Sequence, residues 1–267
     1  MKIITWNING YRSITGQNPS KRYNKVSREN QLFKYIKKEK PDIICLQETK
    51  ASIEQINEDL QYPFKYFGYY NSCETKKGYS GVVTFSKSEP KKVNYKLGIK
   101  KFDEEGRVVE THFKDFILLN IYFPKGYAAS ERLDFKLEFY DIIIGYCKKL
   151  KKINKNIIIC GDFNTAHHPI DLARPEQNHG TSGFMPIERE KLDLLINNGY
   201  LDTFRHFVKD TGHYTWWSQR GRARENNVGW RIDYHFVTEN MVKRIKKAYQ
   251  QPDMMGSDHC PVVLVLK

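Results

Sequence analysis

The chain has 267 residues, 40% hydrophobic and 13% aromatic, so it is not disordered and is long enough to bury a substantial core. Its 44 Lys and Arg residues against 31 Asp and Glu residues give a net charge of +13, which favours a polyanionic partner such as nucleic acid. The lysines between 148 and 152 lie at the end of a predicted helix, where the helix dipole and solubility explain them equally well.

No apolar run approaches the length needed to span a bilayer, and no signal peptide is evident, so we expect no membrane association. The five cysteines are scattered and never form a C-x-x-C pair, which indicates a reduced, intracellular protein. We therefore expect a cytoplasmic protein, associated with the nucleoid in a prokaryote or with the nucleus in a eukaryote.

Short runs rich in β-branched residues predict strands along the whole chain, at Lys2–Trp6, Asp42–Leu46, Gly81–Phe85, Val108–Phe113, Phe116–Phe123, Asn156–Cys160, Arg231–Val237 and Pro261–Leu266. Three helices are predicted between them, at Ser27–Lys38, Ser130–Lys151 and Pro186–Asn198. Longer polar loops are expected at Gly10–Lys25, Tyr70–Ser80, Thr165–Gly183 and Ser218–Gly229. Because no repeat or linker interrupts this pattern, we expect one α/β domain over residues 1–267.

Polar side chains end or open six of the predicted strands, at Asn7 and Asn9, Glu48, Tyr122, Asp162 and Asn164, Asp233, and Asp258 and His259. Each of these residues taken alone is more often a turn former, a solvated acid or a buried histidine than a catalyst. Antiparallel neighbours bring the start of one strand beside the end of the next, so all six sets can share one edge. Together they form a chemically complete set of carboxylates, amides, a phenol and an imidazole.

Eight motifs resemble those of the exonuclease III-type apurinic/apyrimidinic endonucleases, within the endonuclease/exonuclease/phosphatase superfamily. They are W-N-I-N-G, L-Q-E-T-K, K-G-Y-S-G-V, N-I-Y-F-P, G-D-F-N-T-A, I-D-L-A-R-P, N-V-G-W-R-I-D-Y and G-S-D-H-C-P-V. The resemblance runs from Asn7 to Val262 and implies a DNase I-like fold. That fold is a four-layer α/β sandwich of two packed mixed sheets with outer helices.

The resemblance also implies roles for the polar residues at the strand ends. Glu48 is the principal Mg²⁺ ligand, with Mn²⁺ as a substitute metal, and Asn9 and Asp258 are nearby or water-mediated contributors. Asp162 orients and deprotonates the attacking water, while Asn7 and Asn164 hold the water or the phosphate. Tyr122 faces the phosphate, either as a hydrogen-bond donor or, with a depressed pKa, as a phenolate.

His259 is expected against the scissile phosphate with a carboxylate behind its ring, and the family pattern assigns that carboxylate to Asp233. Asp258 and His259 are adjacent in the chain, which suggests a pair. Successive residues of an extended segment point to opposite sides, so we expect Asp258 to turn instead towards the metal's water shell or a loop.

The resemblance places Trp216 and Trp230 in a pocket for an extruded abasic sugar, with Ile232 as an apolar wall. Core packing is the commoner fate of tryptophan and competes most strongly for Trp217. Phosphate contacts are expected from cations and a tyrosine in the loops, although a solvated surface is the commoner place for any one cation; they are Tyr11, Arg12, Lys76, Lys77, Arg220, Arg222 and Arg224.

Two positions depart from the commonest family pattern. Lys125 stands where many relatives carry Asn or Gln, which adds a full positive charge near Tyr122. Asn9 stands where some relatives carry Asp, which weakens its assignment as a metal ligand.

The sequence thus predicts a monomeric, Mg²⁺-dependent DNA repair nuclease that acts on duplex DNA carrying abasic sites or blocked 3′ ends. It would cleave 5′ to the abasic site and leave a 3′-hydroxyl, with 3′→5′ exonuclease or 3′-end-cleaning activity from the same site. The rivals are a phosphoesterase of another superfamily branch, acting on phosphoinositides or sphingomyelin, and a catalytically silent nucleic-acid-binding module.

Overall fold

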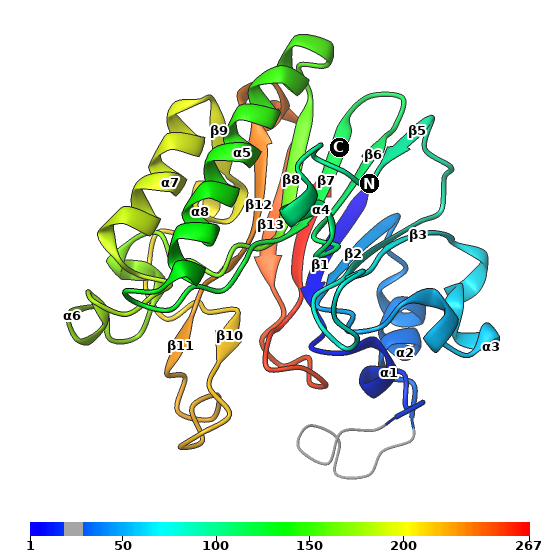
Figure 1. The fold of residues 1–267 in the computed structure, drawn as a ribbon, viewed down its shortest axis with the longest axis horizontal. Helices are drawn as coiled ribbons and strands as arrows, with labels where there is room; N and C mark the ends of the chain where they lie inside the picture. Colours follow the sequence, from blue (N-terminus) through cyan, green and yellow to red (C-terminus); the bar gives the residue numbers. More distant parts are fainter. Residues whose placement is uncertain (19–28) are drawn as a thin grey trace.

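Two six-stranded sheets pack face to face at the centre of the structure, a computed structural model that describes residues 1–18 and 29–267 (Figure 1). The first sheet has the order β13 (Ile245–Gln250), β14 (Val262–Leu266), β1 (Lys2–Asn7), β2 (Ile43–Gln47), β4 (Val82–Ser86) and β3 (Phe67–Asn71). The second has the order β5 (Lys92–Asn94), β6 (Val108–His112), β7 (Ile117–Tyr122), β8 (Ile157–Asp162), β12 (Asp233–Thr238) and β9 (Tyr200–Asp202). Each sheet contains one parallel pair, β1 with β2 and β7 with β8, so both are mixed.

Apolar side chains from both sheets fill the space between them, including Ile3, Cys45, Leu118, Ile158 and Leu264. A buried polar bridge also joins the sheets, because the Gln47 amide on β2 donates to Asn120 Oδ1 on β7 at 2.7 Å. These contacts hold the two sheets in one relative position. The polar residues at the ends of their strands are therefore also held in place relative to one another.

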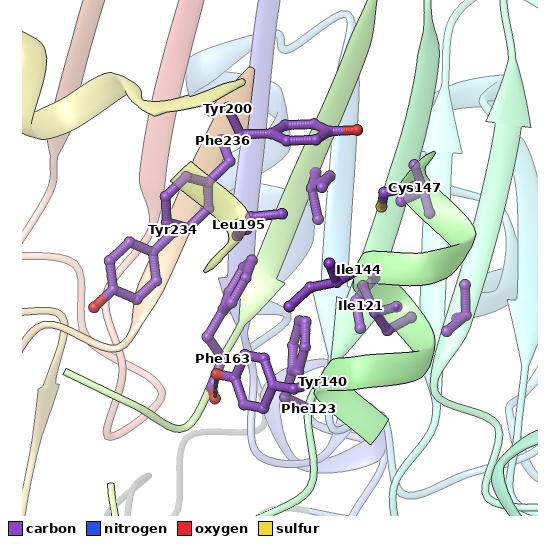
Figure 2. Packing of buried hydrophobic residues seen from close by; sticks show 14 of the residues in the cluster. Ile121, Phe123, Tyr140, Ile144, Cys147, Phe163, Leu195, Tyr200, Tyr234 and Phe236 are labelled. Carbon is purple, nitrogen blue, oxygen red and sulfur yellow. Dashed lines mark hydrogen bonds between the residues drawn. The ribbon is translucent and has the colours of Figure 1, made fainter. Parts of the chain in front are cut away.

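Helices cover the outer faces and complete the four-layer α/β sandwich that the sequence predicted. On the first sheet, α2 (Gln31–Glu39) contributes Leu32 and Ile36 to a core with Ile44. On the second sheet lie α5 (Glu131–Ile153) and α7 (Pro186–Asn197). Figure 2 shows the packing beneath α5, where Tyr140 and Ile144 lie in one core cluster with Phe123 and Phe163, which directly follow β7 and β8.

Shorter elements connect the layers. The helices are α1 (Tyr11–Ile14), α3 (Glu58–Gln61), α4 (Lys100–Asp103), α6 (Pro175–Asn178) and α8 (Thr203–Phe207), with 3₁₀ turns at Ile53–Gln55, Pro63–Lys65, Pro169–Asp171 and Glu239–Arg244. A small ribbon of β10 (Trp216–Trp217) and β11 (Gly229–Trp230) projects from the end of the second sheet at which β8 ends and β12 begins (Figure 1). No helix within the described ranges is both long enough and apolar enough to cross a membrane.

The eight predicted strands and three predicted helices are all present, with ends shifted by a few residues. The first helix begins later than expected, at Gln31, because Asn30 is its N-cap and accepts from Phe33 N at 2.8 Å. Ser27, the predicted cap, lies outside the described residues. The missed strands β3, β5, β9 and β13 are the four edge strands of the two six-stranded sheets, and they lack a buried apolar run. The predicted loop at Gly10–Lys25 contains α1, and part of it lies outside the described residues.

Candidate active site

The polar strand ends converge on one edge of the sandwich. Tyr122, which ends β7, pairs in register with Asp162, which ends β8, and Asp162 in turn pairs with Asp233 at the start of β12. Asn7 ends β1, opposite the last residue of β2. This edge opens into a cleft of about 600 Å³, and its lining includes Asn9, Glu48, Lys50, Tyr122, Lys125, Asp162, Asn164, Gly183, Trp216, Arg220, Trp230, Ile232, Asp258 and His259.

Asp162 lies at the centre of the cleft's hydrogen-bond network. Asn7 Nδ2 donates to Asp162 Oδ2 at 2.8 Å, and the backbone N of Asn164 donates to Oδ1 at 2.8 Å. Burial, followed by the charge of Asp233, raises the pKa of Asp162 to about 7, although His259, Asn7 and Asn164 oppose the rise. A carboxyl with a pKa near neutrality is suited to accept a proton from water during a reaction.

His259 takes its carboxylate from Asp233, as the sequence predicted. The distance from His259 Nδ1 to Asp233 Oδ2 is 2.8 Å, and His259 Nε2 lies 3.9 Å from Asp162 Oδ2. Burial alone would lower the pKa of His259, but the Asp233 carboxylate outweighs it and the pKa rises to about 10. The ring is therefore an imidazolium at neutral pH, with Nδ1 donating to Asp233.

Asp258 points away from His259, which confirms the predicted division of this adjacent pair. Its Oδ1 accepts from Asn9 Nδ2 at 2.9 Å, and its Oδ2 accepts from Trp216 Nε1 at 3.2 Å. Asp258 thus connects the predicted metal-binding side of the cleft with the tryptophan side.

Glu48 and Asn9 present oxygen atoms to one cation position. Lys50 Nζ lies 2.8 Å from Glu48 Oε1 and also donates to Asn9 Oδ1. Asn7 Nδ2 holds the other Glu48 oxygen at 3.0 Å. Because hard oxygen atoms already converge on a positive charge here, the residues fit a divalent ion such as Mg²⁺. Asp258 would contribute to such a site through Asn9.

Ligand atoms of Asp162, Asp233 and His259 form a second group, within 4.8 Å of one another. In the structure Asp233 and His259 are hydrogen-bonded to each other. An imidazolium carries protons on both ring nitrogens and cannot ligate a metal, so we favour the Glu48 side for the ion.

Tyr122 is a neutral phenol in this site. Burial, together with the nearby charges of Glu48 and Asp162, raises the pKa of Tyr122 well above its usual value. The Arg107 guanidinium lies 4.9 Å from the centre of the tyrosine ring, and its Nη1 donates to the Tyr122 carbonyl at 2.9 Å. The raised pKa disfavours the phenolate alternative from the sequence and favours the hydrogen-bond-donor alternative.

An apolar pocket adjoins the catalytic groups. Trp216 and Trp230 pair across β10 and β11 with ring centres 6.4 Å apart at 83°, and they pack with Ile232 and Phe184. Gly183 makes this packing possible, because a Cβ at this position would lie 3.1 Å from the Trp230 ring and the backbone φ is +101°. Trp217, by contrast, is 3% exposed and packs in a separate core cluster.

Not every predicted contact residue lies at the cleft. Tyr11 is fully buried, and its hydroxyl donates to the Leu60 carbonyl at 2.7 Å, so the prediction that it meets phosphate is wrong. The W-N-I-N-G motif brought Tyr11 near the site in sequence, but α1 turns its side chain into the core. Arg12, on the same helix, is half-buried, and Arg222 is exposed 3.9 Å from Glu225; neither lines the cleft.

Sequence reasoning missed several residues that hold the site in place. Lys136 and Glu188 form a fully buried ion pair at 2.6 Å, and Lys136 Nζ also donates to the backbone carbonyl of Asn164 at 2.7 Å. Ser257 Oγ donates to the Asn7 carbonyl at 2.7 Å. Lys50 was also missed, although its place two residues after Glu48 in L-Q-E-T-K was a usable signal.

Four non-glycine residues of the cleft hold a left-handed backbone, Asn9 (φ 48°), Glu48 (φ 57°), Lys50 (φ 52°) and Asn164 (φ 51°). Asparagine tolerates this conformation, but for glutamate it costs free energy, on the order of 1–3 kcal/mol, that the surrounding structure must offset. Such local strain is concentrated at functional sites, which agrees with a role for Glu48 beyond packing.

The chain is similar to known nucleases in sequence and in fold. A model of the endonuclease/exonuclease/phosphatase family matches residues 4–259. The chain is 41% identical to an exodeoxyribonuclease of Bacillus subtilis, over 100% of this chain and 99% of that relative. It is 37% identical to a DNA-(apurinic or apyrimidinic site) endonuclease of Dictyostelium discoideum, over 100% of this chain and 70% of that protein. The structure of an AP endonuclease from Archaeoglobus fulgidus aligns with a TM-score of 0.86 and 26% identity, covering 100% of this chain and 99% of that one.

Proposed function

The chain belongs to the endonuclease/exonuclease/phosphatase family, and on that premise we propose that it is a DNA repair nuclease for abasic sites. It hydrolyses the phosphodiester on the 5′ side of an abasic site in duplex DNA, leaving a 3′-hydroxyl and a 5′-deoxyribose phosphate. All 267 residues form one catalytic domain, and the protein acts as a monomer. It is located with the DNA, in the nucleoid of a prokaryote or the nucleus of a eukaryote. The observation that carries the proposal is one cleft that joins the Asp162–His259–Asp233 set to the Trp216–Trp230 pocket.

Asp162 is the base in this mechanism. It accepts a proton from the water that attacks the phosphorus, and its pKa of about 7 leaves a large deprotonated fraction at neutral pH. Asn7 fixes the orientation of the carboxylate through its 2.8 Å hydrogen bond. As the new P–O bond forms, the bond from phosphorus to the 3′ oxygen breaks, and that oxygen gains a proton to become the 3′-hydroxyl.

His259 and Tyr122 stabilise the charge that develops on the phosphate. The imidazolium of His259, held by Asp233, supplies a fixed positive charge, and the Tyr122 phenol supplies a hydrogen bond. Glu48 and Asn9 would hold a divalent ion, with Asp258 supporting Asn9. A bound Mg²⁺ or Mn²⁺ would neutralise part of the negative charge that develops on the phosphate.

The apolar pocket supports an abasic substrate over intact DNA. Trp216, Trp230 and Ile232 leave room beside the catalytic groups for a sugar without a base, and extrusion costs least where no base is stacked or paired. The same catalytic groups would act on a blocked 3′ end, because removal of the block breaks the same bond from phosphorus to the 3′ oxygen. Lys125, Arg12 and Arg222 are proposed phosphate contacts at or beyond the edge of the cleft.

Incision of a duplex that carries one tetrahydrofuran abasic analogue tests this proposal. Release of phosphate from an inositol phosphate, without cleavage of DNA, would favour another branch of the superfamily. Binding of the duplex without cleavage in the presence of Mg²⁺ would favour a silent nucleic-acid-binding module.

A further inference from the structure

A cluster of unpaired cations lies at the end of the sandwich opposite the cleft. We define this basic pole by Lys152, Lys155, Lys243, Arg244, Lys246 and Lys247. Strand directions place it there, because β8 runs from Ile157 beside Lys155 to Asp162 at the cleft, and β12 runs from Asp233 at the cleft to Thr238. In Figure 1 the C-terminal end of α5, the start of β8 and the end of β12 lie at the top, and the β10–β11 ribbon lies at the bottom.

The six cations belong to one continuous surface. The Lys155 carbonyl accepts hydrogen bonds from Thr238 Oγ1 at 2.7 Å and from Asn240 Nδ2 at 3.4 Å, which joins the end of α5 to the 3₁₀ turn Glu239–Arg244. That turn leads directly into β13 (Ile245–Gln250). A register shift between Ile245 and Lys247 lets Lys246 and Lys247, although successive, both be exposed.

These charges have no ion-pair partner in residues 1–18 and 29–267, the part of the chain that the structure describes. Among the described residues, none of the six side chains has an ion-pair or hydrogen-bond partner. Between residues 239 and 250, Glu239 is the single acid against four cations. Clustered like charges repel one another, so their concentration at one end is unfavourable for the isolated protein.

The pole is too far from the cleft to act on the phosphates bound there. A strand of six residues such as β12 spans about 20 Å, whereas charges in physiological salt are screened over about 8 Å. The helix dipole explains Lys152 at the end of α5, but it does not explain the four cations between Lys243 and Lys247. A separate polyanion would gain from replacing its condensed counterions with these fixed cations.

We propose that the basic pole binds a second segment of duplex DNA, so that one molecule holds two duplexes at opposite ends. The choice of DNA rests on the proposed function, which already places the protein on DNA. A nuclease with this surface can stay attached to one segment while its cleft samples another.

Energy transfer between two short, intact duplexes, one with a donor and one with an acceptor dye, tests the proposal. The assay contains chelator, so that binding is measured without cleavage. Wild-type protein should bring the dyes together at low salt. The triple variant Lys243→Gln, Lys246→Gln, Lys247→Gln should need about tenfold more protein to do so, because each lost cation removes a released counterion. Incision of the abasic duplex by this variant should match wild type.

A matched control separates clustered charge from total charge. Lys37→Gln, Lys65→Gln, Lys96→Gln removes three exposed cations at other places and should leave the bridging intact. Equal bridging by wild type and the pole variant would overturn the proposal, as would wild-type binding to phosphatidylserine vesicles without any bridging. Failure of the proposed function would appear separately, as absence of incision by wild type.

Discussion

The Nδ1 atom of His259 donates a hydrogen bond to Asp233 Oδ2 at 2.8 Å, although Asp258 is its neighbour in the chain. The pair joins β12 of the second sheet to the segment that enters β14 of the first. The charged imidazole in the cleft therefore depends on the position of one sheet relative to the other.

Asp233→Asn should move the alkaline limit of activity to lower pH. In wild type, kcat/KM should rise with pH as Asp162 deprotonates near 7 and fall as His259 deprotonates near 10. Removing the Asp233 charge lets burial lower the pKa of His259, so the imidazolium is lost earlier. Asp258→Asn is the control and should shift this limb far less. An unchanged alkaline limb in Asp233→Asn would show that His259 does not act as the cation.

Asp162→Asn and Glu48→Gln should abolish incision while much of the DNA binding remains. Loss of a general base lowers kcat by about 10²–10⁴-fold, and loss of a metal ligand removes several kcal/mol of charge stabilisation. Single-turnover incision and binding to an abasic duplex, measured on the same preparations, separate the two effects. Near-wild-type turnover in either variant would mean that its role is assigned wrongly.

Lys50→Gln should tighten the binding of Mn²⁺ to the DNA-free protein. The Lys50 ammonium contacts the Glu48 and Asn9 oxygens that a divalent ion would use, so an ion must displace it. Calorimetric titration with Mn²⁺ gives the dissociation constant directly. Lys125→Gln removes an equal charge from the lining of the same cleft without a contact to Glu48, and it should have a smaller effect. Equal or weaker Mn²⁺ binding in Lys50→Gln would contradict this competition.

Gly183→Ala should weaken recognition of the abasic site and lower Tm. The added Cβ would lie 3.1 Å from the Trp230 ring and 3.2 Å from the Asn164 carbonyl, at a φ that disfavours alanine. We expect a higher KM for an abasic duplex than in wild type. Gly180→Ala, whose Cβ meets nothing within 4 Å, is the matched control. The same KM in both variants would remove the support for a shape-dependent pocket.

The fold and most of the cleft could be predicted from the sequence, because both depend on short patterns of neighbouring residues. Apolar runs mark central strands, and the residue after each run marks the edge of the sheet, so Glu48, Asp162 and Asp233 could be placed together. The alternation of side chains along a strand was enough to separate Asp258 from His259.

What the sequence could not supply depends on side-chain direction and on contacts between distant segments. Tyr11 lies beside a motif yet points into the core, because α1 rather than a loop carries it. The Lys136–Glu188 pair joins two helices 52 residues apart, and only their packing brings it under Asn164. Edge strands such as β13, with two lysines side by side, lack the apolar pattern that identifies a central strand.

The most direct test of the central claim is incision of an end-labelled duplex with one tetrahydrofuran abasic analogue, in Mg²⁺ and then in chelator. We predict a single cut on the 5′ side of the analogue in Mg²⁺, with a 3′-hydroxyl that a DNA polymerase can extend, and no cut in chelator. A duplex that is bound but stays whole in Mg²⁺, or a cut on the 3′ side of the analogue, would contradict the account.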